Sequence, residues 1–76
     1  MALVTGFEPK ELAHASAQKP VEASYSSIEI DGERFFQIDT YGSAERQMVG
    51  KRSQSIRLNR QAAEQLISLL KQEFNL

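Results

Sequence analysis

The side chains of this sequence that are best suited to bind a ligand are its aromatic and basic ones. Five basic residues and no acid occur between positions 46 and 60, whereas eight of the ten acids precede position 46. Clustered cations attract phosphate, and aromatic rings stack on bases at about 1–3 kcal/mol per base. Three aromatic and four basic residues are the candidates for these contacts: Tyr25, Phe35, Tyr41, Arg46, Lys51, Arg52 and Arg57. They predict a surface that binds single-stranded nucleic acid, with DNA as the expected form.

Patterns for catalysis or metal binding are missing from the sequence. There is no cysteine, the single histidine, His14, lies in a weakly patterned segment, and the sequence contains no serine nucleophile motif. The acids are scattered singly, and the spacing between Gly42 and Lys51 does not fit a phosphate-binding loop. We therefore expect no enzyme activity, no cofactor and no metal site.

Other interpretations of the same residues stay open. In one, the basic stretch is a solvated loop that balances the acidic half of the chain. In another, Tyr25, Phe35 and Tyr41 are buried against a second protein, and the chain is a protein-interaction or assembly module of a homodimer with no nucleic-acid activity. A small enzyme would require a partner subunit to complete its site.

Length and composition limit what can position these residues. The chain has 76 residues, of which 41% are hydrophobic and 25% charged, so it can build one small core. A domain of this size buries only about 60% of its unfolded surface, which favours a homodimer. No apolar run is long enough to span a membrane, and the start lacks a secretory signal, so we expect a cytoplasmic protein.

The hydrophobic pattern predicts an α+β fold. Residues 1–20 are expected to form a flexible N-terminal arm, and residues 21–76 a domain with a β-sheet and a helix. The sheet is predicted to be antiparallel, with three to four strands, followed by one long C-terminal amphipathic helix packed on one face. The expected elements are strands at 22–30, 34–41 and 53–58, a polar loop at 42–52 and a helix at 60–74 capped by Asn59; a fourth strand could come from residues 2–5 or from residues 21–22.

The hairpin at Asp31-Gly32 decides which side chains share a face. A three-residue loop with a bulge would place Ile28, Ile30, Phe36 and Ile38 together under the helix, so we predict this turn. The helix-free face would then carry the three aromatic residues Tyr25, Phe35 and Tyr41.

The order of elements resembles a known family. A glycine turn at Gly32 precedes Phe35-Phe36-Gln37-Ile38-Asp39, then Gly50-Lys51-Arg52, then Ile56-Arg57-Leu58-Asn59 at the start of the helix. Over about residues 25–74 this pattern is similar to the single-stranded-DNA-binding transcriptional coactivators of the positive cofactor four type and their small bacterial relatives. The resemblance implies a homodimer packed partly through its terminal helix. It also implies phosphate contacts by Lys51, Arg52 and Arg57, and base stacking by Phe35 or Tyr41.

Overall fold

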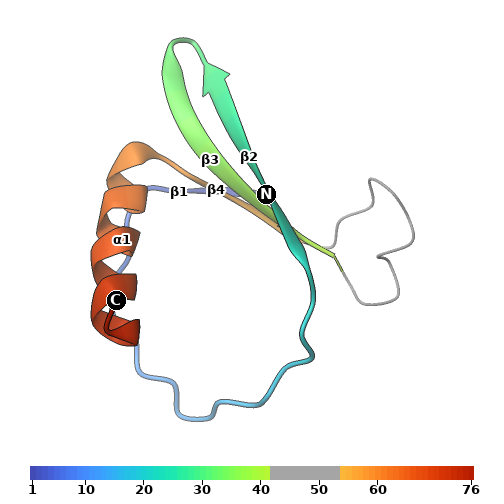
Figure 1. Ribbon diagram of the computed structural model, residues 1–76, viewed down its shortest axis with the longest axis vertical. Coiled ribbons are helices and arrows are strands. Elements are labelled where there is room, and N and C mark those ends of the chain that lie inside the picture. The colour runs from blue at the N-terminus through green and yellow to red at the C-terminus, as the bar shows by residue number, and fades with distance from the viewer. Residues whose placement is uncertain (42–53) are drawn as a thin grey trace.

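The computed structural model describes residues 1–41 and 54–76, which form a four-stranded sheet and one helix (Figure 1). The elements follow one another as β1 (Ala2–Val4), β2 (Ala23–Ile30), β3 (Glu33–Thr40), β4 (Gln54–Leu58) and α1 (Arg60–Phe74). The predicted α+β fold is confirmed, and the strand and helix bounds lie within one or two residues of those expected. No helix in the described ranges is long and apolar enough to cross a membrane.

The first strand comes from the segment expected to be an exposed arm. The strand order is β1-β4-β3-β2; β1 pairs with β4 in parallel, and the other neighbours are antiparallel. The carbonyl oxygen of Val4 also accepts a hydrogen bond from the Asn59 amide, at 3.3 Å. The start of the chain is thereby attached to the residue that opens the helix.

The turn between β2 and β3 differs from the prediction. Ile30 pairs with Glu33 and Ile28 with Phe35, so the loop has two residues and the predicted bulged turn is wrong. Asp31 and Gly32 both have positive φ, at 52° and 79°. Such a turn matches the right-handed twist of the flanking strands, and Asp-Gly is one of its preferred sequences. The local turn geometry therefore decided the register, against the count of apolar residues per face.

This register assigns the side chains to two faces. Directly paired residues point to the same side of a sheet. The face on the helix side, called here the helix-side face, carries Tyr25, Phe36, Ile38, Ile56 and Leu58. The opposite, helix-free face carries Ile28, Ile30, Phe35, Gln37, Asp39 and Arg57. The prediction that Ile28 and Ile30 lie under the helix is therefore wrong, as is the placement of Tyr25 on the helix-free face.

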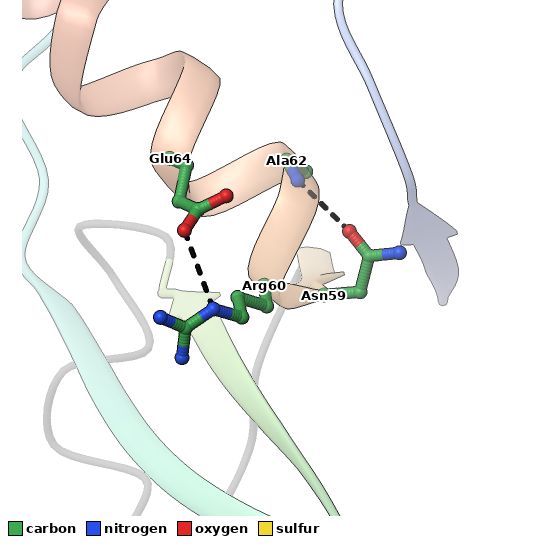
Figure 2. A network of polar contacts seen from close by, with 4 residues as sticks. All are labelled: Asn59, Arg60, Ala62 and Glu64. Carbon is green, nitrogen blue, oxygen red and sulfur yellow. Dashed lines mark hydrogen bonds and ion pairs between the residues drawn. The ribbon is translucent and has the colours of Figure 1, made fainter.

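The helix begins at the predicted cap. The Oδ1 atom of Asn59 accepts a hydrogen bond from the Ala62 amide at 2.9 Å (Figure 2). Asn59 has extended backbone angles, as a residue before the first helical turn requires. At the other end Asn75 adopts a left-handed conformation, with φ 56°, and closes the helix.

The core is small. Among the residues that the structure describes, only two apolar side chains are buried, Leu58 (3% exposed) and Ala62 (fully buried). Much of α1 extends beyond the sheet, and the segment that follows β1 runs beside this helix (Figure 1). Gln65 holds this segment by two 2.8 Å hydrogen bonds with the backbone of Phe7. The helix is thus attached by its first turns, while its later apolar residues stay open to solvent.

Candidate binding surfaces

Polar side chains form a hydrogen-bonded chain on the helix-free face. Gln37 and Asp39 are 5% and 6% exposed, although both lie in a sheet face that α1 does not cover. Gln37 donates from Nε2 to Asp39 Oδ1 at 3.0 Å, and Ser55 Oγ donates to the same carboxylate oxygen. Arg57 donates to Gln37 Oε1 from Nε at 3.1 Å and from Nη2 at 2.7 Å. These hydrogen bonds join β3 to β4 and fix the direction of the Arg57 side chain.

The structure brings three of the predicted site residues to this face. Phe35 and Arg57 lie there by register, and Tyr41 joins them because its hydroxyl lies 2.9 Å from Ser24 Oγ, on the same side. All three predicted residues are half-buried. The two bonds to Gln37 use two of the five N–H donors of the guanidinium, so Arg57 retains donors for an acceptor at this face. An aromatic and cationic surface on the helix-free side is therefore present in part.

The other four predicted residues do not join that group. Tyr25 lies on the helix-side face. Arg46, Lys51 and Arg52 fall outside the described residues, so their place relative to Arg57 stays a prediction from the sequence.

Tyr25 contributes instead to an apolar surface on the helix side. Its side chain is 74% exposed and stacks on Phe36. Phe36 in turn borders a groove of about 230 Å³ between the β2–β3 hairpin and the start of α1. The groove is lined by Ser27, Arg34, Phe35, Phe36, Leu58, Asn59, Arg60 and Ala63. Sequence reasoning missed this groove because it assigned Phe36 to a covered core.

The two arginines of the groove already have acidic neighbours. Arg34 Nη2 lies 3.8 Å from Glu29 Oε1, and Arg60 Nε lies 3.2 Å from Glu64 Oε2 (Figure 2). All four side chains are largely exposed, so each pair contributes little to stability. The pairs nevertheless offset the positive charge beside Phe36, which favours an apolar or neutral occupant over phosphate.

The apolar surface continues from the sheet onto the helix. Exposed side chains on it are Tyr25, Phe36 and Ile56 from the sheet, and Ile67, Leu70 and Phe74 from α1. We call these six residues the assembly surface. Ala63 lines the groove and belongs to the same helical stripe as the last three, which makes the sheet and helix parts adjacent. Contiguous apolar surface of this kind marks interaction sites in proteins.

Metal-binding groups are not gathered in the described ranges: no three His, Cys, Asp or Glu side chains lie close enough together to hold an ion. His14 lies on an exposed segment between β1 and β2.

Comparison with known proteins identifies no relative. No protein-family model matches this chain, and neither does any curated protein or solved structure. None of these comparisons tests the resemblance to the coactivator family, and an order of strands and helix alone defines no family. Membership in that family stays a prediction.

Proposed function

We propose that this chain is a protein-interaction module whose partner is a second copy of itself. The observation that carries the proposal is the contrast between two buried apolar residues, Leu58 and Ala62, and the exposed assembly surface. Burying apolar area contributes about 25 cal/mol per Å², and it is the main favourable term in both folding and association. A chain that leaves this area open gains stability when another copy covers it.

The total surface area supports this proposal. The chain exposes 6817 Å², whereas a compact monomer of 8.6 kDa is expected to expose about 4,700 Å². A standard protein interface removes about 800 Å² from each partner. The chain thus exposes more surface than a compact monomer of its mass, and the extended segment between β1 and β2 accounts for part of the excess.

The test is the oligomeric state in solution, measured by sedimentation equilibrium over a range of protein concentrations. We expect a reversible dimer, and Leu70→Asp should shift it toward monomer because it places a charge in the assembly surface. Leu12→Asp is the matched control: Leu12 is 69% exposed but lies outside the assembly surface, so its variant should dimerise as the original chain does. A chain that stays monomeric at all concentrations would refute the proposal.

A second candidate function, binding of single-stranded nucleic acid, is supported by one observation: Phe35, Tyr41 and Arg57 share the helix-free face. Dimerisation through the helix side would leave this face open. Backbone phosphates would be held by Arg57 and by Arg46, Lys51 and Arg52 of the polar loop, with bases stacking on the two rings.

This candidate is tested by fluorescence anisotropy of a labelled single-stranded oligonucleotide and its duplex at two salt concentrations. Reversing Arg46, Lys51 and Arg52 to Glu should abolish binding, while Tyr41→Ala should weaken it with little change in salt dependence. Leu12→Ala is the control, because Leu12 is 69% exposed and lies outside both proposed surfaces, so its replacement should not change the affinity. Undiminished binding by the triple variant would exclude this mechanism.

A further inference from the structure

We propose that the two copies associate by antiparallel packing of their α1 helices about a twofold axis, with Phe74 of each copy seated in the groove beside Ala63 of the other. This inference rests on the proposed self-association and adds to it a contact surface, an orientation and a register.

The helix carries a continuous apolar stripe suited to such packing. Ala63, Ile67, Leu70 and Phe74 are separated by four, three and four residues, the spacing that keeps side chains along one line of a helix. Ile67, Leu70 and Phe74 are 56%, 41% and 65% exposed. The side of the helix that contacts its own chain is a different one, defined by buried Ala62 and by Gln65.

Antiparallel packing pairs the residues of this stripe by size. If Ile67 of one helix faces Leu70 of the other, then Ala63 faces Phe74, and both pairs occur twice because of the twofold axis. A small residue opposite a large ring allows close packing. A parallel arrangement would instead place Phe74 against Phe74 and leave the space beside Ala63 empty.

The groove provides the space that the ring requires. Ala63 lines it together with Phe36 and Leu58, and its volume is about 230 Å³. For comparison, an apolar cavity of about 150 Å³ is large enough for benzene. Phe74 of the second copy would therefore cover Phe36, and the sheet part of the assembly surface would be buried together with the helix part.

Charges beside the stripe agree with the same register. Glu64 and Lys71 follow the stripe residues Ala63 and Leu70 by one position each, so both lie on the same flank. In the antiparallel pair, these flanks meet, and Glu64 of each copy approaches Lys71 of the other. Two opposite-charge contacts result, while Glu64 can retain its neighbour Arg60.

A charge exchange tests this register. Lys71→Glu should weaken the dimer about tenfold in Kd because two attractive contacts become repulsive, and Glu64→Lys should act similarly. The double variant Glu64→Lys/Lys71→Glu should restore most of the affinity. Circular dichroism should show equal helix content in all four chains, so that a change in Kd reports the contact rather than unfolding.

Cross-linking tests the orientation, since the chain has no cysteine of its own. Ala63→Cys and Phe74→Cys chains are mixed and oxidised, and each is also oxidised alone. A disulfide-linked dimer in the mixture only is the expected result; a linked dimer of Ala63→Cys alone indicates parallel helices and overturns the inference.

The two proposals fail in distinguishable ways. If the unaltered chain dimerises but neither charge variant changes Kd and the mixture does not cross-link, the dimer uses another surface, and only this inference is overturned. If the unaltered chain is monomeric, both are overturned.

Discussion

The ring of Tyr25 on β2 stacks on the ring of Phe36 on β3, with 5.5 Å between the centroids and 19° between the ring planes. The two residues are diagonal neighbours, because Tyr25 pairs with Ile38 and Phe36 pairs with Ser27. Diagonal neighbours on one sheet face are within reach of aromatic side chains. The stack therefore links the two strands of the hairpin on the helix side, and it exists only in the two-residue turn register.

Replacing Tyr25 tests the contribution of this stack. Tyr25→Ala should lower the free energy of unfolding by about 1 kcal/mol, the usual size of an aromatic pair, whereas Tyr25→Phe should keep most of it. Urea unfolding at one fixed protein concentration measures the difference, because the proposed dimerisation would make stability depend on concentration. Equal losses in both variants would show that the hydroxyl group, not the ring, matters.

Replacing Gly32 tests the backbone conformation of the turn between β2 and β3. The φ of Gly32 is 79°, and a Cβ atom added there would meet nothing within 4 Å, so a side chain has room but an unfavourable backbone conformation. Gly32→Ala should cost about 1 kcal/mol, and Gly32→Asn less, because asparagine tolerates the left-handed region. Thermal unfolding of the two variants ranks them. Equal unfolding temperatures for the two substitutions would contradict a left-handed backbone conformation at this position.

Replacing Asp39 tests the hydrogen bonds between polar side chains on the helix-free face. Asp39→Ala removes the acceptor for Gln37 Nε2 and Ser55 Oγ, and a buried donor without a partner costs about 1–3 kcal/mol. The exposed Ser26, on the same face of β2, provides the control, since Ser26→Ala should change stability by less than about 0.5 kcal/mol. Equal unfolding midpoints for the two variants would contradict a structural role for the carboxylate.

The helix cap gives a local prediction. Asn59→Ala should lower the free energy of unfolding by about 1 kcal/mol through loss of the bond to the Ala62 amide. Asn59→Asp retains a side chain of the same length with an acceptor oxygen, so its free energy of unfolding should be close to that of the original chain. Chemical denaturation followed by far-ultraviolet circular dichroism distinguishes the two. A neutral Asn59→Ala substitution would indicate that water satisfies the amide equally well.

Local signals in the sequence predicted most of the elements. Asn59 and the apolar spacing after it predict α1 with the observed bounds, and the alternation at 53–58 predicts that Ile56 and Leu58 lie on the helix side, as observed. The sequence predicts β1 less clearly, because three residues carry little pattern and their partner strand, β4, lies more than 50 positions away, as the pairing of Ala2 with Ile56 shows.

The faces of the hairpin could not be obtained by counting apolar residues. That count assumes that every apolar side chain must enter the core of a single chain. Here Tyr25 and Phe36 lie on one face and Ile28 and Phe35 on the other, and the monomer covers neither set fully. The predicted nucleic-acid surface is divided for the same reason. The observed pairing of β2 with β3 differs by one residue from the predicted pairing, so Tyr25 lies on the helix-side face, while Phe35 and Arg57 lie on the helix-free face as predicted.

The parallel pairing of β1 with β4 affects how this chain acquires its structure during synthesis. The β2–β3 hairpin joins neighbouring segments and can form as soon as Thr40 has left the ribosome. Ala2, in contrast, has to wait for Ile56, and closing so long a loop is entropically costly and slow. Until β4 emerges, the β1 segment has no strand to pair with, and the sheet consists of the β2–β3 hairpin alone.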